Sequence, residues 1–239
     1  MNIVLLRSQD FIDPQRAILK DRRAEHVRRV LRAEPGDWLR VGLLGGARGQ
    51  ATITAISPTD VSLSLPQALD EPPPARHPWR LVLALPRPKM LRRVLRCCAE
   101  LGVANVHLIH SYRVEKSYWQ SPLLSPSALE QALLAGLERA GDTVAPQVTL
   151  HRRFRPFIED ELPVLAAGHP IYLAHPGSSR HLPTDDRQQA TLVIGPEGGF
   201  IPFEVDLAET LGAIPCSLGL RVLSVDTAVN AALSRQLYT

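Results

Sequence analysis

Hydrophobic and polar residues follow one pattern before residue 70 and another after it. Over residues 1–68 the apolar positions form short runs, at 2–6, 38–43, 50–56 and 61–65, that are typical of strands. Turn signals such as Pro35-Gly36-Asp37 separate these runs. The spacing predicts a small β-barrel.

Two other segments divide this first part from the rest. A helix is expected at about residues 22–32, where Val27, Val30 and Leu31 can face the core while the arginines point outward. Residues 69–78 are rich in proline and poor in apolar side chains, which favours a stiff linker. We therefore expect a first domain over 1–70, a linker over 71–78 and a second domain over 79–239.

After the linker, strand patterns alternate with helix patterns. Strands are predicted at 80–85, 106–109, 171–174, 192–194 and 214–218, and helices at 89–101, 126–139, 202–211 and 227–237. This alternation predicts an α/β fold with a mainly parallel sheet. Residues 140–170 give no clear pattern.

Composition narrows the class of protein. The 239 residues are 45% apolar and 21% charged, which is ordinary for a globular protein. No apolar run is long enough to cross a bilayer, and Arg7 and Asp10 interrupt the pattern that a signal peptide would need, so we expect a cytoplasmic protein. The three cysteines lack the spacing of a metal site, so neither a disulfide nor a bound metal is expected.

The net charge of +3 is unevenly distributed. It is +1 over residues 1–75 (10 basic, 9 acidic), +7 over 76–116 (9 and 2) and −5 over 117–239 (8 and 13). Clustered arginine favours a polyanionic partner such as RNA, although a solvated helix face is the simpler alternative. The candidate RNA-binding residues are Arg22, Arg23, Arg28, Arg29, Arg32, Lys89, Arg92, Arg93 and Arg96.

Two glycine-containing turns follow strands near the carboxyl terminus. The first is Gly195-Pro-Glu-Gly-Gly199, and the second contains Gly219 after the strand at 214–218. Open α/β sheets bind ligands at the carboxyl ends of their strands, so these turns are expected to enclose one small-molecule pocket. Nucleoside triphosphates and dinucleotides are disfavoured, because neither GxxxxGK[ST] nor GxGxxG with its acidic residue is present. A tight turn without ligand is the alternative for the first loop.

Two further residues are candidates for this pocket. His175 follows the strand at 171–174, where a histidine more often hydrogen-bonds the local backbone than acts as a base, and we expect it to form a wall. Arg221 lies beside the second glycine turn, in a position to organise backbone carbonyls or to contact a substrate.

Several motifs together resemble one known family. They are Gly195-Pro-Glu-Gly-Gly199, Leu218-Gly-Leu-Arg-Val-Leu223, Asp226-Thr-Ala228, His175-Pro176, Lys89-Met90, Glu100-Leu-Gly-Val103, and His26-Val-Arg-Arg-Val-Leu-Arg32 leading to Pro35-Gly36-Asp37. This set resembles the SPOUT methyltransferases of the 16S ribosomal RNA uridine-N3 type. The resemblance covers both domains and is most specific at the carboxyl terminus.

The resemblance implies both a fold and an activity. It implies an amino-terminal PUA-like barrel that binds RNA, a carboxyl-terminal domain closed by a trefoil knot, and a homodimer. The implied reaction transfers the methyl group of S-adenosylmethionine to N3 of a uridine, with Arg221 favouring the anionic base. By similarity, the residues expected at the cofactor are Leu173, His175, Gly195, Glu197, Gly198, Gly199, Ser217, Leu218, Gly219, Arg221 and Leu223.

The chain departs from the family pattern at four places. Residues 224–227 read Ser-Val-Asp-Thr where the family usually has Arg-Thr-Glu-Thr, and Leu220 replaces a usual proline. Ile201 stands ahead of Pro202 where the family usually has a Ser capping box, so only the proline is expected to start that helix, and Asp142 stands where the family tends to have Arg. Two alternatives therefore stay open beside the methyltransferase. One is a paralogue of the same fold that methylates another RNA or none, and the other is a non-catalytic RNA-binding factor in ribosome assembly.

Overall fold

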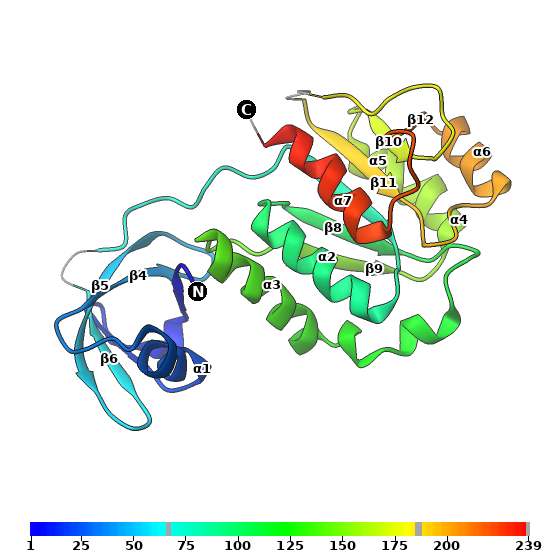
Figure 1. The fold of residues 1–239 in the computed structure, drawn as a ribbon. Helices are drawn as coiled ribbons and strands as arrows, with labels where there is room; N and C mark the ends of the chain where they lie inside the picture. Colours follow the sequence, from blue (N-terminus) through cyan, green and yellow to red (C-terminus); the bar gives the residue numbers. More distant parts are fainter. Residues whose placement is uncertain (66–67, 185–187, 238–239) are drawn as a thin grey trace. The chain divides into compact units, whose positions relative to one another are not determined.

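The computed structural model describes residues 1–65, 68–184 and 188–237, which form two units (Figure 1). The first unit holds Met1–Ala75 together with Leu137–Ala145, and the second holds Arg76–Gly136 and Pro146–Thr239. The division between them falls within the proline-rich segment. Residues 137–145 join the first unit because Asn2 and Ile3 donate backbone hydrogen bonds to the Glu138 carbonyl.

The first unit is built on a six-stranded sheet in the order β1-β4-β5-β6-β3-β2. Among the described residues of this unit, β1 and β4 pair in parallel and the other neighbouring strands pair antiparallel. The inward side chains, including Leu6, Leu19, Val41, Ile53 and Leu63, form a continuous buried core. The strands are β1 (Val4–Leu6), β2 (Phe11–Asp13), β3 (Arg16–Leu19), β4 (Trp38–Leu43), β5 (Arg48–Ile56) and β6 (Val61–Ser64), with a short helical turn η1 (Ser8–Asp10).

The helix expected at 22–32 is present but is not a regular α-helix. It begins as α1 (Arg22–Glu25), where the Asp21 side chain accepts from the Arg23 N–H, and continues as the π-helical turn η2 (His26–Leu31). Val27 is buried as expected, but Val30 and Leu31 are exposed, so that part of the prediction was wrong. A π-helical turn holds more residues than an α-helical turn, and the α-helical spacing therefore misplaces the side chains that follow.

The second unit contains a fully parallel six-stranded sheet in the order β12-β10-β11-β7-β8-β9. The α/β class with a mainly parallel sheet is thus confirmed. Its central strands are almost completely buried, as expected for a parallel sheet covered on both faces. The strands are β7 (Trp79–Ala84), β8 (Asn105–Ile109), β9 (Gln147–His151), β10 (Ile171–Ala174), β11 (Ala190–Ile194) and β12 (Ala213–Cys216).

Helices cover both faces of this sheet. Figure 1 shows α2, α3 and α7 on one side and α4, α5 and α6 on the other. Gly136 lets α3 approach α2, because a Cβ at that position would collide with the Arg96 carbonyl. The helices and helical turns are α2 (Pro88–Glu100), η3 (Lys116–Gln120), η4 (Pro122–Leu124), α3 (Pro126–Ala140), α4 (Phe154–Pro156), η5 (Phe157–Glu161), α5 (Leu162–Ala166), α6 (Pro202–Thr210), α7 (Val225–Leu233) and η6 (Ser234–Gln236).

Candidate functional site

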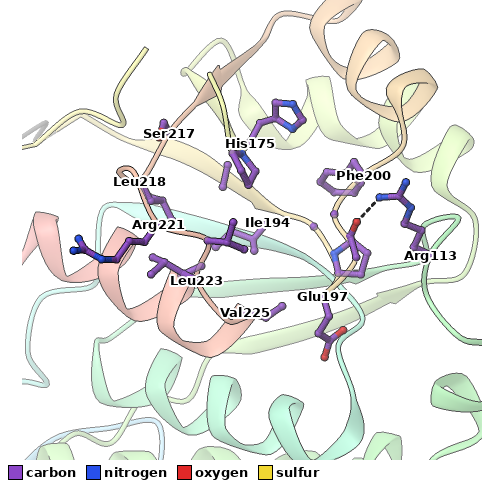
Figure 2. Close-up of a pocket in the computed structure, with 18 of the residues that line it drawn as sticks. Arg113, His175, Ile194, Glu197, Phe200, Ser217, Leu218, Arg221, Leu223 and Val225 are labelled. Atoms are coloured by element: carbon purple, nitrogen blue, oxygen red, sulfur yellow. Dashed lines mark hydrogen bonds between the residues drawn. The ribbon is translucent and has the colours of Figure 1, made fainter. Parts of the chain in front are cut away.

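The second unit contains a pocket of about 290 Å³ at the carboxyl ends of β10, β11 and β12 (Figure 2). Its walls are the loops after β10, β11 and β12 and the first turn of α7, with Arg113 added from the loop after β8. The lining residues are Arg113, Ala174, His175, Pro176, Ile194, Gly195, Pro196, Glu197, Gly198, Gly199, Phe200, Ser217, Leu218, Gly219, Arg221, Val222, Leu223, Val225 and Ala228. The two glycine turns that the sequence singled out therefore line one pocket.

The loop after β11 has little room for side chains. A Cβ on Gly195 would lie 3.1 Å from Cδ2 and 3.3 Å from the backbone N of Phe200. Gly199 has a φ of +72°, and its N–H donates to the Pro196 carbonyl at 2.8 Å, which closes a tight turn. Bare backbone thus faces the pocket because the turn itself requires glycine.

The loop after β12 forms the second wall. The Ser217 hydroxyl accepts from the Gly219 N–H at 3.1 Å and donates to the Gly219 carbonyl at 3.0 Å. Gly219 has a φ of +137°, a conformation that other residues rarely adopt. The Arg235 guanidinium, near the carboxyl terminus, donates to the Leu218 carbonyl at 3.3 Å. Side-chain contacts therefore hold this loop in one shape.

The loop after β10 completes the enclosure. The His175 backbone N–H donates to the Cys216 carbonyl at 3.0 Å, and the side chain lines the pocket, as expected for a wall (Figure 2). Leu173 is buried in the sheet and does not line the pocket, so its neighbour Ala174 takes the place expected for it. Side chains alternate between the two faces of a strand, so a shift of one position changes which side chain reaches the pocket.

Arg113 is a pocket residue that sequence reasoning missed. Its guanidinium donates to the Gly198 carbonyl (Figure 2), and a Cβ on Gly198 would lie 3.0 Å from Arg113 Cδ. The residue lies in the loop after β8, within the part of the chain that carries a charge of +7. That charge signal was available, but nothing in the spacing connects this loop with one that follows it by 85 residues.

The buried carboxylate of Glu204 joins the loop that carries Arg113 to the start of α6. Its Oε1 accepts from the Tyr112 N–H at 2.7 Å, and its Oε2 accepts from the Ile201 N–H at 3.1 Å. The sequence predicted that only Pro202 would start this helix, because Ile201 has no capping group. That prediction was wrong, since Glu204 supplies the carboxylate half of a capping box.

The charged residues at the rim point in different directions. Arg221 is exposed, and its guanidinium extends away from the glycine loop (Figure 2). Glu197 is also exposed and accepts from the Arg87 N–H at 3.0 Å, which joins the glycine loop to the start of α2. Arg113, by contrast, directs its guanidinium to the glycine loop after β11, where it donates to the Gly198 carbonyl.

The basic residues of the first unit are not all available to RNA. Arg23 is buried and donates to Asp10, Asp21 and the Leu5 carbonyl, so the structure contradicts its assignment as an RNA contact. Arg22 forms a two-point ion pair with Glu138, at 2.5 and 3.0 Å. Arg29 pairs with Glu25 at 3.0 Å, Arg28 is half-buried, and Arg32 is exposed. Sequence proximity to other arginines did not reveal that Arg23 stabilises the core.

The basic face of α2 is also partly neutralised. Lys89, Arg92, Arg93 and Arg96 are exposed as expected, but Arg96 pairs with Glu100 at 2.8 Å and Arg93 lies 3.6 Å from Asp226. A hydrogen bond from the Ser224 hydroxyl, together with Arg93, lowers the pKa of Asp226 and keeps it charged. Acidic side chains therefore compensate two of the four basic residues on this face.

The cysteines make no disulfide, and among the described residues no group of His, Cys, Asp or Glu is arranged to hold a metal ion. Burial raises the pKa of the Cys97 thiol to about 12, and its Sγ donates to Asn230 Oδ1 at 2.7 Å. Within the described ranges, no helix is both long and apolar enough to span a membrane.

Comparisons with known proteins agree with this architecture. The model of an RNA methyltransferase domain matches residues 73–236. A protein of Treponema pallidum named ribosomal RNA small subunit methyltransferase E is 29% identical over 97% of this chain and 89% of its own length. A Legionella pneumophila methyltransferase solved with bound S-adenosylmethionine has a TM-score of 0.76 at 24% identity, covering 98% of this chain and 95% of that one. A Neisseria gonorrhoeae ribosomal RNA small subunit methyltransferase E, also bound to S-adenosylmethionine, has a TM-score of 0.72 at 19% identity, covering 98% and 95%.

Proposed function

The chain belongs to the RNA methyltransferase domain family, and from this premise we propose that it methylates N3 of a uridine in 16S ribosomal RNA with S-adenosylmethionine as methyl donor. The observation that carries the proposal is the pocket. The three loops that enclose it contain the motifs on which the family resemblance rests. A relative that covers most of the chain is named a small-subunit ribosomal RNA methyltransferase, which supports the choice of RNA.

The chemistry of the pocket fits this cofactor. S-adenosylmethionine carries no phosphate, so its adenosine and methionine parts are held by apolar contact and backbone hydrogen bonds. The walls offer apolar side chains, including Ile194, Leu218, Leu223 and Val225, beside glycine backbone. We propose that these residues hold the cofactor together with the others that the resemblance implied, with Ala174 in the place of Leu173.

The bound cofactor supplies an electrophilic methyl group, and the protein positions the acceptor. N3 of uridine lies on the Watson–Crick edge, so the base must be unpaired when it reaches the pocket. Rigid glycine turns would fix the line from nitrogen to methyl to sulfur, and such alignment contributes much of the acceleration in transfer reactions. A cation near the uracil oxygens stabilises the base as its imide proton leaves to water. We propose Arg221 for this role from the resemblance, since it borders the pocket.

Three structural expectations are part of the same proposal. The first unit would be a PUA-like RNA-binding domain. The carboxyl terminus would form a trefoil knot, supported by the bridge between His181 and Ser217 and by the hydrogen bond from Arg235 to the Leu182 carbonyl. The protein would be a homodimer in the cytoplasm, and the exposed apolar side chains of Leu220 and Val222 beside the pocket support the dimer.

Two measurements test the proposed function. Calorimetry with S-adenosylmethionine should give low-micromolar or tighter binding, whereas no binding at millimolar cofactor would contradict an enzyme and favour an assembly factor. Nucleoside mass spectrometry of 16S ribosomal RNA from cells without this protein should show the loss of one N3-methyluridine. Loss of a methyl group from another RNA instead would favour the paralogue.

A further inference from the structure

We propose that a strip of basic and aromatic side chains beside the pocket holds the RNA strand next to the target base. The pocket-side strip consists of Tyr112, Arg113, Lys116, Arg152 and Arg153. This proposal rests on the proposed function. The strip differs from the basic surfaces that the sequence suggested, since none of its residues was among the candidate RNA-binding residues. The loop after β8 and the segment that follows β9 supply its members.

Direct contacts connect the strip to the pocket. Arg113 donates to the Gly198 carbonyl, and the ring of Phe154, which follows Arg153, lies 5.8 Å from the ring of Phe200 in the pocket wall. Both segments extend from the carboxyl ends of paired strands, because Ile109 of β8 lies opposite His151 of β9. A strand of RNA bound here would therefore pass the mouth of the pocket.

The two segments are also tied to each other. The Arg152 guanidinium lies 5.1 Å from the centre of the Trp119 ring, in a cation–π contact. The Trp119 Nε1–H donates to His110 Nδ1 at 3.0 Å, and the His110 N–H donates to the His151 carbonyl at 2.9 Å. Stacking on an aromatic face fixes the guanidinium plane while its N–H edge stays available to a phosphate.

The positive charge of the strip is not cancelled internally. Arg113, Lys116, Arg152 and Arg153 are all exposed, and none forms an ion pair with a carboxylate among the described residues. Burial and the nearby Lys116 lower the pKa of His110, so this ring is a neutral acceptor for Trp119 and adds no charge of its own. The strip thus differs from α2, where acids face two of the four basic residues.

Tyr112 adds a surface for base stacking. Its side chain is 77% exposed, although its backbone N–H is held by the buried Glu204. An exposed ring on an anchored backbone is suited to stack on an unpaired base, and single-stranded RNA is bound by this combination of stacking and phosphate contacts. Because N3 is reached only in an unpaired uridine, we expect a base next to that uridine in the same RNA strand to stack on Tyr112.

Equilibrium binding to a short, single-stranded RNA that contains uridine tests the strip. The double variant Arg152→Ala/Arg153→Ala should bind more weakly, and the slope of log K against log salt should flatten by about 1.4, at about 0.7 for each lost phosphate contact. Arg155→Ala is the matched control, because Arg155 lies in the same segment but pairs with Glu159 at 2.8 Å. An unchanged slope in the double variant, or an equal effect in the control, would overturn the proposal.

Substitution of Tyr112 tests the stacking role separately. Tyr112→Ala should weaken binding between about 5-fold and 160-fold, as expected for one stacked base, and Tyr112→Phe should keep the original affinity. Equal affinity of the alanine and phenylalanine variants for the oligonucleotide would contradict stacking. S-adenosylmethionine binding and RNA methylation by the unaltered protein are measured in parallel. If the unaltered protein binds S-adenosylmethionine and methylates RNA while the strip variants bind RNA normally, the proposed role of the strip is wrong and the proposed function stands.

Discussion

Glu204 offers the most informative test of how the site is assembled. Its buried carboxylate accepts two backbone N–H groups, from Tyr112 at 2.7 Å and from Ile201 at 3.1 Å. A hydrogen bond to a charged group contributes about 1.5–3 kcal/mol, so losing both would cost about 3–6 kcal/mol before any water enters. We expect Glu204→Ala to lower the free energy of unfolding by about 3–4 kcal/mol. Glu204→Gln keeps one acceptor oxygen and should cost about half as much.

Urea denaturation of the purified variants measures this effect. Glu209→Ala is the control, because Glu209 is exposed on the same helix, and it should change stability by less than about 0.5 kcal/mol. Well below its unfolding temperature, Glu204→Ala should also bind RNA more weakly, since the loop that carries Tyr112 and Arg113 loses its anchor. A Glu204→Ala protein with the urea midpoint of the Glu209→Ala control would refute this account of the two loops.

Three further predictions follow from buried groups and tight contacts. Asp10→Ala removes the two-point carboxylate partner of the buried Arg23, which then keeps only Asp21 and the Leu5 carbonyl, and it should cost about 3–5 kcal/mol in urea unfolding. A cost below about 1 kcal/mol would show that the pair is not needed. Burial lowers the pKa of His107 from 6.5 to about 4, so between these pH values the unfolded chain binds a proton that the folded chain does not. The free energy of unfolding should therefore fall as the pH drops from about 6.5 to 4. A His107→Gln protein whose free energy of unfolding falls as steeply with pH would contradict this. Gly195→Ala brings a Cβ within 3.1 Å of the Phe200 ring and should weaken cofactor binding at least about 10-fold by calorimetry, so unaltered affinity would argue against the closed loop.

Much of the fold was predictable because its signals are local. Apart from β9, the strands of the second unit are apolar runs that end at turn residues, and α2 has one apolar face, so their places follow from the sequence. The strands β2 and β3 are short and contain charged residues, and they were missed. Residues 140–170 were not assigned because β9 is only partly buried and η5 departs from the α-helical period.

The site was predictable only as far as it is continuous in sequence. The glycine loops could be identified because a tight turn leaves its own signature at neighbouring positions. Arg113 and Glu204 reach the same site through contacts that span 85 and 92 residues, and no local pattern records them. The RNA-binding prediction for Arg23 was wrong for a similar reason, because only the fold shows that Asp10 lies beside it in the interior.

The strand order of the parallel sheet has a consequence for how the protein forms during synthesis. The central strand β7 pairs with β11, so the backbone of Trp79 cannot form its sheet contacts until Ala190 has been synthesised. Likewise, β10 is paired on both sides only after β12 has been synthesised. Folds dominated by such distant pairings fold slowly, because the chain must close large loops before any contact rewards it. The growing polypeptide therefore holds an unfinished apolar sheet until the segments that contain β11 and β12 have left the ribosome, and the pocket at the ends of β10, β11 and β12 forms among the last features of this unit.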